Sequence, residues 1–348
     1  MGKKKLIIAV VAGGNGSEYE ISLRSGEGIM SFLDKKKFRP YFVCIRGTSW
    51  RVRIESDDEQ FRIKNEEWCE IDKNDFSFTY QDIKVSFDFA YIIIHGTPGE
   101  NGPLQGYFSL LGIPYSSCNV LVSALTFNKY KCNRFLHSCG IKVASNLLFR
   151  REDILSQDLS PIIQRLIKEI GLPCFVKVTE GGSSIGCIKA TDVHGLEKAL
   201  QDVFNYGDEA MCEQFIPGRE FSCGIYQTHQ QYHVLPVAEI VSHNDFFDYD
   251  AKYNDKGEEI VPAHIPNNLS DAIQSTTLQV YKTLGCQGIV RVDFIVDNLS
   301  DVYVLEVNTT PGMTNKSIVP KEIRAAGNEI SAVLDEIIEE AYKSSCQN

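Results

Sequence analysis

Several common functional signatures are missing from this chain of 348 residues. Its eleven cysteines include no CxxC pair, and its seven histidines form no cluster, so zinc and dithiol redox motifs are poorly supported. Scattered cysteines of this kind are expected to be buried free thiols in a reducing cytoplasm. The apolar runs are too short to cross a membrane, and a signal-peptide pattern is absent. We therefore expect a cytoplasmic protein with no membrane partner.

Positive charge is also scarce. The chain has 35 Lys and Arg against 46 Asp and Glu, a net charge of −11, which argues against a nucleic-acid partner. Apolar residues make up 43% and charged residues 23%, the balance of a soluble globular protein. A chain of this length exceeds one ordinary core, so two or three domains are expected.

Two nucleotide-binding signatures are absent or broken. The phosphate-loop string GxxxxGK followed by Ser or Thr does not occur. Gly14-Asn15-Gly16 provides the GxG of a dinucleotide fingerprint, but Tyr19 occupies the place of the third glycine. Arg46 stands at the end of the second predicted strand, where an NAD site needs an acid for the ribose. An NAD-dependent oxidoreductase is therefore disfavoured.

The first 118 residues have the pattern of an α/β domain. Residues 6–12, LIIAVVA, predict a buried parallel strand, and YFVCI and FAYIIIHG predict two more. Ligands collect at the carboxyl ends of such strands, where Glu18 and His95 occur. Both also have ordinary explanations, because Glu18 is a favourable acid for a first helical turn and His95 could be a structural histidine.

A different architecture begins near Asn119. LPCFVKV and CIKAT predict two strands that flank TEGGSSIG, a loop rich in glycine and serine. The N–H groups of this loop and the hydroxyls of Ser183 and Ser184 could cover a polyphosphate, for which Lys177 supplies a point charge. The alternative is an ordinary hairpin with a flexible tip.

The next segment, EAMCEQFIPGREFSCGIY, predicts two strands around a Pro-Gly turn. Glu213, Glu220 and the main chain near Ile216 could line a groove between sheets. Residues 244–256 contain FFDYDAKY in an otherwise irregular stretch, and long loops of this kind are often functional lids. A final helix over residues 329–344 carries an apolar stripe that predicts either core packing or a subunit contact.

Residues 288–317 predict a β-hairpin that ends in a glycine-bearing loop. Strand alternation places Arg291 and Asp293 on one face of the first arm, and Glu306 and Asn308 together on the second. If Asp293 lies across from Glu306, then Arg291 lies across from Asn308. Two opposed carboxylates repel each other and usually need a cation between them, and oxygen ligands suit Mg²⁺. The alternative is an exposed face with scattered charges.

Six strings in this order resemble the D-alanine–D-alanine ligases of the ATP-grasp superfamily. They are GGNGSEYEISL, HGTPGENGPLQGYFSLLGIPY, KVTEGGSSIG, EQFIPGREF, FFDYDAKY, and VRVDF through EVNTTPGMTNKS. The resemblance spans nearly the whole chain and implies an ATP-grasp fold that is α/β at first and α+β in its C-terminal half. It implies three domains: an N-terminal substrate-binding domain (1–118), a central ATP-grasp domain (119–207) and a catalytic ATP-grasp domain (208–348).

The resemblance also implies the reaction. Two D-alanines are joined with cleavage of ATP, through a D-alanyl phosphate intermediate, for peptidoglycan biosynthesis in the cytoplasm. Mg²⁺ or Mn²⁺, with two ions bound, and a homodimer are implied as well. The nearest alternative is the same chemistry with D-lactate or D-serine as acceptor. The other alternative is a nucleotide-binding module without catalysis. The charged and polar residues assigned to catalysis and metal binding in the next paragraph are all present, which argues against this alternative.

Roles for individual residues follow from the resemblance. Those implied in catalysis are Glu18, Ser183, Tyr253 and Arg291. Those implied in binding the amino acids are His95, Lys252, Gly312 and Ser317. Those implied in binding ATP are Lys129, Lys177, Ser184, Glu213, Ile216 and Glu220. Those implied as metal ligands are Asp293, Glu306 and Asn308.

Three departures from the family pattern affect the expected loop contacts. Family members often carry tyrosine where this chain has Phe247 and glutamate where it has Asp250, and an arginine common before the glycine loop is missing from VTEGG. These changes put the closed-loop contacts in doubt but leave the reaction in place. Relatives that make D-alanyl-D-lactate tend to have phenylalanine at the position of Tyr253, so its hydroxyl favours the dipeptide as product.

Overall fold

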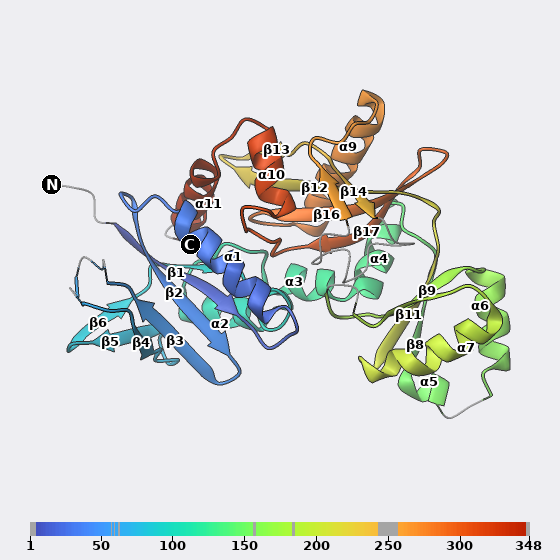
Figure 1. The fold of residues 1–348 in the computed structure, drawn as a ribbon, viewed down its shortest axis with the longest axis horizontal. Coiled ribbons are helices and arrows are strands. Elements are labelled where there is room, and N and C mark those ends of the chain that lie inside the picture. Colours follow the sequence, from blue (N-terminus) through green and yellow to red (C-terminus); the bar gives the residue numbers. More distant parts are fainter. Residues whose placement is uncertain are drawn as a thin grey trace.

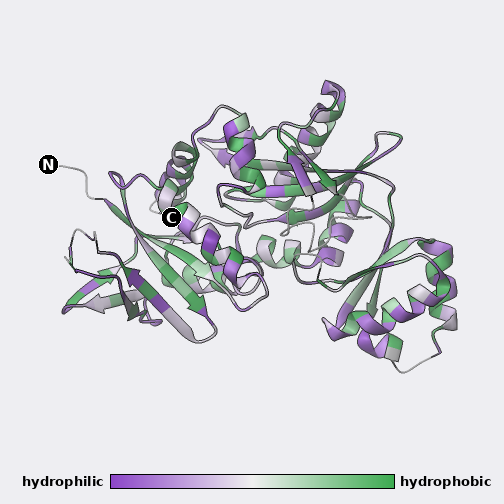
Figure 2. Cartoon of the chain, in the orientation of Figure 1, coloured by the Kyte–Doolittle hydropathy of each residue, from purple (hydrophilic) through white to green (hydrophobic). Residues whose placement is uncertain are grey.

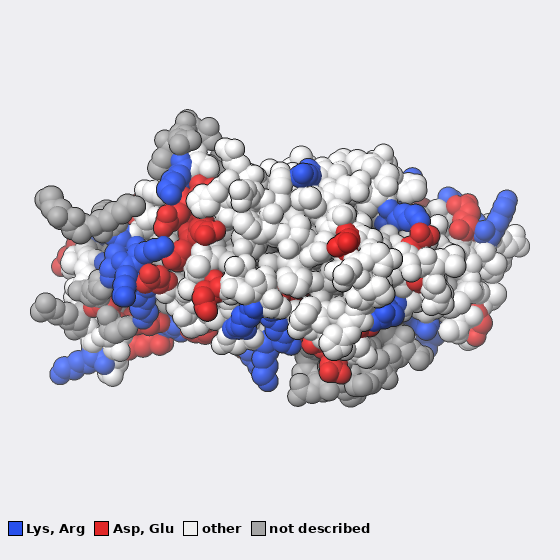
Figure 3. All heavy atoms as spheres, turned by 90° about the horizontal axis from the view of Figure 1, so that it is seen from above, with Lys and Arg blue, Asp and Glu red and all other residues white. Residues whose placement is uncertain are grey.

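The computed structural model describes residues 5–345 except 57, 59, 62, 156–157, 183–184 and 243–256. Three large sheets, each with its own helices, follow one another along the chain (Figure 1). On the face drawn in Figure 3, basic and acidic side chains are interspersed. None of the described helices is both long enough and apolar enough to cross a membrane.

The first sheet has the strand order β4-β3-β2-β1-β7. Its parallel centre confirms the α/β prediction and consists of β1 (Leu6–Gly13), β2 (Phe38–Arg46) and β7 (Phe89–Ile92). Strand β1 is an unbroken apolar run because both faces of it are buried. The antiparallel edge consists of β3 (Ser49–Ile54) and β4 (Glu67–Glu70). A separate hairpin consists of β5 (Ser77–Tyr80) and β6 (Ile83–Ser86). The helices are α1 (Tyr19–Phe32) and α2 (Pro103–Leu111).

The second sheet is antiparallel, with the order β10-β9-β11-β8. Its strands are β8 (Asn146–Arg150), β9 (Cys174–Val178), β10 (Cys187–Ala190) and β11 (Glu209–Gln214). Its helices are α5 (Arg151–Leu155), α6 (Ser160–Glu169), α7 (Val193–Asp202) and the short 3₁₀ helix η1 (Val203–Asn205). Because β11 pairs with β8 and β9, this sheet extends beyond residue 207, the predicted end of the central domain.

The third sheet has the order β15-β14-β12-β16-β17, and β13 pairs with β12. Its strands are β12 (Gly218–Thr228), β13 (Gln231–Val234), β14 (Ala238–Ser242), β15 (Gly257–Ile260), β16 (Val290–Asp297) and β17 (Val302–Asn308). The helices that share its core are α3 (Val120–Phe127), α4 (Lys129–Ser138) and α9 (Asn267–Leu284). Helices α3 and α4 therefore pack on the third sheet, whereas the predicted boundaries put them in the central domain (119–207).

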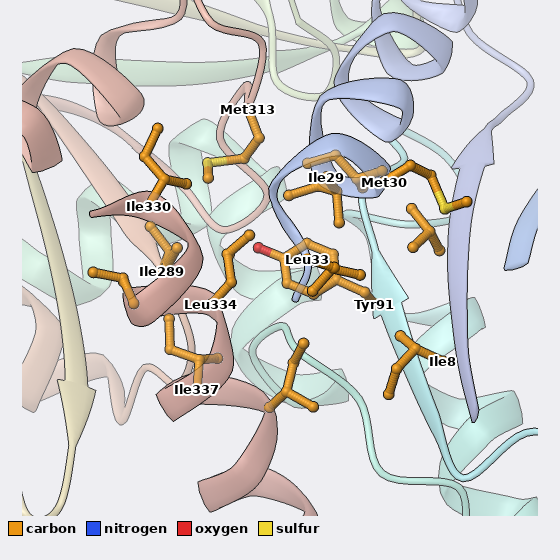
Figure 4. Packing of buried hydrophobic residues seen from close by; sticks show 14 of the residues in the cluster. Ile8, Ile29, Met30, Leu33, Tyr91, Ile289, Met313, Ile330, Leu334 and Ile337 are labelled. Atoms are coloured by element: carbon orange, nitrogen blue, oxygen red, sulfur yellow. The ribbon is translucent and has the colours of Figure 1, made fainter. Parts of the chain in front are cut away.

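One apolar core joins the two ends of the chain. Helices α10 (Ile318–Ala325) and α11 (Ile330–Ser345) pack against α1 and the first sheet. Figure 4 shows Leu334 and Ile337 of α11 facing Leu33 and Tyr91. Hydrophobic and hydrophilic residues alternate along the last helix (Figure 2), and its hydrophobic residues are buried in this core. This packing holds the loops after β1 and β7 close to the β16–β17 hairpin.

Candidate active site

The β16–β17 hairpin has the register that strand alternation predicts. Arg291 lies across from Asn308, and Asp293 lies across from Glu306. Asn308 Nδ2 donates to Asp293 Oδ2 at 2.9 Å, so the two side chains share one face. The register shifts between Asp293 and Phe294, which the sequence did not predict. The hairpin thus gathers a cation, two carboxylates and an amide above an apolar backing.

The carboxylate of Asp293 accepts several hydrogen bonds on this face. Arg291 donates to it twice, from Nε to Oδ1 at 2.9 Å and from Nη2 to Oδ2 at 2.8 Å. Ser222 Oγ on β12 donates to Oδ1 at 2.7 Å. Burial lowers the pKa of Arg291, but Asp293 and Glu306 raise it more, so the guanidinium remains charged. Sequence reasoning missed Ser222, which becomes visible only when β12 is paired with β16.

Lys129 links the hairpin to the glycine-rich loop. Its Nζ lies 3.8 Å from Glu306 Oε2 and donates to Gly181 O at 2.5 Å. Its backbone N–H donates to Thr179 O at 2.8 Å. Asn128, the N-cap of α4, accepts from the Lys131 N–H and donates from Nδ2 to a carboxylate on the same loop. The start of α4 therefore fixes a cation between the predicted metal-binding hairpin and the predicted phosphate-covering loop.

A buried ion pair lies in the second sheet. Lys177 Nζ and Glu213 Oε2 are 2.6 Å apart, and Asn133 Nδ2 on α4 donates to Glu213 Oε1 at 3.3 Å. Burial lowers the pKa of Lys177, but the adjacent Glu213 carboxylate raises it more, so the ammonium group of Lys177 remains charged. Asn133 carries no motif that a sequence search could have detected.

The other two predicted ATP-binding residues that the structure describes follow this pair along the chain. Ile216 occurs in the short connection between β11 and β12. Glu220 lies on β12, between Ile240 of β14 and Ile295 of β16. The predicted residues Ser183, Ser184, Lys252 and Tyr253 lie outside the described residues.

The N-terminal loops meet the other two parts of the molecule at this point. Glu18 precedes α1, and its carboxylate lies against the glycine-rich loop, because a Cβ placed on Gly182 would overlap Glu18 Oε2. His95 Nδ1 lies 2.9 Å from Thr310 O, and its Nε2 lies 3.2 Å from Ser25 Oγ. Burial lowers the pKa of His95, so the neutral ring donates to the carbonyl through Nδ1 and accepts from the serine.

A cavity of about 900 Å³ lies between these segments. Its wall contains eight of the predicted residues: Glu18, His95, Lys129, Arg291, Glu306, Asn308, Gly312 and Ser317. Lys177, Glu213, Ile216, Glu220 and Asp293 do not line it. Its volume lies in the range of small-molecule sites. The structure thus brings the predicted amino-acid site and one side of the hairpin into a single chamber.

Glu100 also lines the cavity, and sequence reasoning did not select it although it lies in the HGTPGENG string. Its Oε2 accepts the Gly96 N–H at 3.0 Å. Burial raises the pKa of this carboxyl to about 7, a rise that the hydrogen bond from Gly96 opposes.

The donor set of the hairpin suits a hard cation. Asp293, Glu306 and Asn308 offer only oxygen ligands on one face, which is the preference of Mg²⁺. In the part of the chain that the structure describes, no three His, Cys, Asp or Glu side chains are grouped as a metal site. The fit therefore rests on these two carboxylates and one amide, together with phosphate oxygens from a substrate.

Comparisons with known proteins agree over both halves of the chain. The family model for the D-Ala D-Ala ligase N-terminus matches residues 7–118, and that for the C-terminus matches residues 135–339. The D-alanine–D-alanine ligase of Phocaeicola vulgatus is 46% identical, with 97% of this chain and 100% of that protein covered. The corresponding enzyme of Parabacteroides distasonis is 45% identical over 97% of this chain and 98% of that protein.

Solved structures give the same result. A D-alanine–D-alanine ligase from Coxiella burnetii superposes with a TM-score of 0.85 at 28% identity, covering 99% of this chain and 96% of that one. A D-Ala:D-Ser ligase from Enterococcus faecalis superposes with a TM-score of 0.84 at 29% identity, covering 97% of this chain and 100% of that one. A Bacillus anthracis D-alanine–D-alanine ligase in complex with ATP gives 0.74 at 31% identity, covering 99% of each chain.

The fold and the site together define an ATP-grasp ligase. The chain belongs to the D-alanine–D-alanine ligase family. It is an ATP-dependent enzyme that joins two D-alanines to D-alanyl-D-alanine for peptidoglycan synthesis. The predicted reaction, its substrates and the fold class are thereby confirmed.

Proposed function

We propose that the cavity is the chamber in which the two D-alanines meet the γ-phosphate of ATP. The observation that carries this proposal is the hairpin register, which puts Arg291, Asp293, Glu306 and Asn308 on one face. Phosphoryl transfer depends on alignment and charge neutralisation more than on a covalent group of the protein. A face that combines a cation with metal-binding oxygens meets that need.

In the first step, the carboxylate of the first D-alanine attacks the γ-phosphorus, ADP leaves and D-alanyl phosphate forms. Glu18 would hold the ammonium of this D-alanine, with His95 beside it. Lys129 and Lys177 would bind phosphate oxygens of ATP, and Arg291 would stabilise the transferring phosphoryl group.

In the second step, the second D-alanine loses an ammonium proton and its amine attacks the acyl carbon. A tetrahedral intermediate forms and then expels phosphate, leaving the peptide bond. Arg291 and the Gly312 backbone would stabilise the oxyanion, while Ser317 and Lys252 would grip the second carboxylate. Ser183 and Tyr253 would hydrogen-bond toward Glu18 and hold the 244–256 loop closed.

The nucleotide would lie along the second sheet. Glu213 and the main chain at Ile216 would hold the adenine, Glu220 the ribose, and Ser184 the phosphates. Asp293, Glu306 and Asn308 would hold Mg²⁺ or Mn²⁺, with two ions in the filled site. When bound, the metal would neutralise phosphate charge and align the γ-phosphate for displacement.

Mg²⁺-dependent phosphate release from ATP tests the proposal, with D-alanine as substrate and L-alanine as control. We expect turnover only when D-alanine and a divalent cation are both present. Arg291→Ala should lower kcat at least about a hundredfold, in line with the loss of one oxyanion donor. Offering D-serine and D-lactate in the same assay separates the acceptors. Normal turnover by Arg291→Ala would contradict the role given to that residue.

We also propose a homodimer and a cytoplasmic location. Leu110 and Leu121 are 88% and 73% exposed on α2 and α3, and Val120 beside Leu121 is 42% exposed, so adjacent helices present apolar side chains to solvent. A second copy of the chain would cover them. Light scattering should give the dimer mass, and Leu110→Lys with Leu121→Lys should give the monomer; a monomeric unmodified protein would refute the proposal. The cytoplasmic location is proposed because the enzyme needs a supply of ATP. Cell fractionation tests this location.

A further inference from the structure

A buried carboxyl lies behind the wall of the cavity. Glu322 on α10 is 0% exposed and is not among the residues that line the chamber. Its Oε1 has no hydrogen-bond partner among the described residues. Burial raises the pKa of this carboxyl to about 8, and Arg291 opposes the rise. A buried ionisable group with an unbonded oxygen lowers stability, so a compensating contribution is expected from its other contacts.

The contact that Glu322 makes lies at a gap in the third sheet. Strand β12 pairs with β14 up to Ser222 and with β13 from Ile225 onward. Between them, Gly224 accepts from the Leu235 N–H at 2.8 Å. Its own N–H donates to Glu322 Oε2 at 3.0 Å, at a residue that is outside the described pairing of β12 with both β13 and β14. The carboxyl thus replaces the missing strand at this residue.

Gly224 is suited to this contact because it lacks a side chain. A Cβ there would stand 2.5 Å from Glu322 Oε2 and 2.8 Å from Leu235 Cδ1. On the other side of β12, Gly224 lies directly across from Arg291, and Ser222 lies directly across from Asp293. The strand that Glu322 anchors is therefore the strand that backs both groups of the proposed transfer site.

Helix α10 also connects this anchor to the acceptor side of the cavity. Its N-cap is Ser317, and Ile318, its first residue, lines the chamber. Glu322 lies in the same helix, so one short rigid element joins Ser317, predicted to bind the second D-alanine, to the strand behind Arg291. A movement of Ser317 would therefore be transmitted to strand β12, and a movement of β12 to Ser317.

We propose that Glu322 is a positioning residue for Arg291. Glu322 holds strand β12 at Gly224, and the strand in turn fixes the guanidinium against Asp293 with its free side facing the cavity. The inference rests on the role proposed above for Arg291. Either protonation state of the carboxyl accepts the Gly224 N–H, so the role requires the hydrogen bond and the shape of the side chain. An amide of the same shape should therefore replace it.

The test compares Glu322→Ala with Glu322→Gln in the full-length enzyme. Removal of the anchor should lower kcat at least about tenfold, because small misplacements of a positioned group are costly, while KM for ATP stays within about twofold. Glu322→Gln should restore most of kcat. Asp335→Ala is the matched control, because Asp335 is another buried carboxyl with an unbonded oxygen among the described residues, and it pairs with Lys37. It should lower the melting temperature and leave kcat unchanged.

A double mutant with Arg291→Lys shows whether Glu322 acts through Arg291. If it does, Glu322→Ala should cause little further loss of kcat in the Arg291→Lys background. Where Glu322→Ala does not fold, Gly224→Ala keeps the carboxyl but displaces it, and the same kcat loss is expected. Multiplying losses in the double mutant, or normal kcat in Glu322→Ala and in Gly224→Ala, would overturn the inference. Normal kcat in Arg291→Lys would instead overturn the role proposed for Arg291.

Discussion

The stability of the protein should fall as pH rises from 5 to 8, and Glu322 should be a main cause. The carboxyl is fully buried, and its pKa is raised from 4.5 to about 8. A folded-state pKa above the unfolded one means that the unfolded chain ionises first. The contribution of Glu322 to stability is therefore complete below pH 4.5 and is lost as pH rises toward 8.

The magnitude follows from the two pKa values. Each unit of difference corresponds to about 1.4 kcal/mol, so the free energy of unfolding should decrease by roughly 3 kcal/mol between pH 5 and pH 8 on account of this group. Glu322→Gln cannot ionise and should lack that part of the slope. Any constant effect of the amide shifts the whole curve and leaves the slope unchanged.

Urea denaturation of the metal-free and nucleotide-free protein at pH 5, 6, 7 and 8 measures this slope. The difference in unfolding free energy between Glu322→Gln and the unmodified protein should grow in favour of the variant as pH rises. Equal m-values in the two proteins are the control that the unfolding transition is the same. Parallel curves, with a difference that changes by less than about 0.5 kcal/mol, would refute the reasoning.

Three further perturbations have definite expected outcomes. Lys177→Met leaves Glu213 as a buried charge without its cation, so the unfolding free energy in urea should drop by about 3 kcal/mol and calorimetric ATP binding should be lost; unchanged stability would contradict the buried pair. Gly28→Ala should raise KM for D-alanine several-fold at constant KM for ATP, because the new Cβ would overlap Met313 O. Gly195→Ala is the control, because its new Cβ would make its nearest contact at an ordinary 3.4 Å. Equal effects of the two substitutions on KM would refute the link between the Gly28 contact and D-alanine binding. Chelation of divalent ions should abolish phosphate release and Mg²⁺ should restore it, whereas activity that survives chelation would exclude the metal proposed for the hairpin.

The hairpin register was predictable because a strand has a side-chain period of two. Once the two arms were recognised, alternation placed Asp293 on one face of its arm and Glu306 with Asn308 on one face of the other, and the alignment of Asp293 with Glu306 brings the three together. The bulge after Asp293 was not predictable, since nothing in the local sequence marks Leu305, the extra residue of β17 between the partners of Asp293 and Phe294. The carboxyl-end loops with Glu18 and His95 were predictable for a similar reason, because parallel strands end at one edge of a sheet.

Other parts of the site were hidden from sequence reasoning. Ser222, Asn133 and Glu322 carry no motif, and each gains its role from a partner far along the chain. The predicted domain of α3 and α4 differs from the observed one for the same reason. Their apolar faces are compatible with either neighbouring sheet, and the structure packs them on the third. Tertiary packing, rather than local pattern, decides such cases.

The core shared by the two chain ends explains how distant motifs form one chamber. Glu18 precedes α1, and α1 packs against α10 and α11, which follow the hairpin in sequence. Gly28 of α1 approaches the Met313 carbonyl so closely that a larger residue would not fit. The proposed donor site and the proposed acceptor loop are therefore held by one continuous apolar contact. A sequence shows that each helix has an apolar stripe, but only the packing shows that these stripes meet, and that meeting would set the distance between the proposed donor site and the proposed acceptor loop.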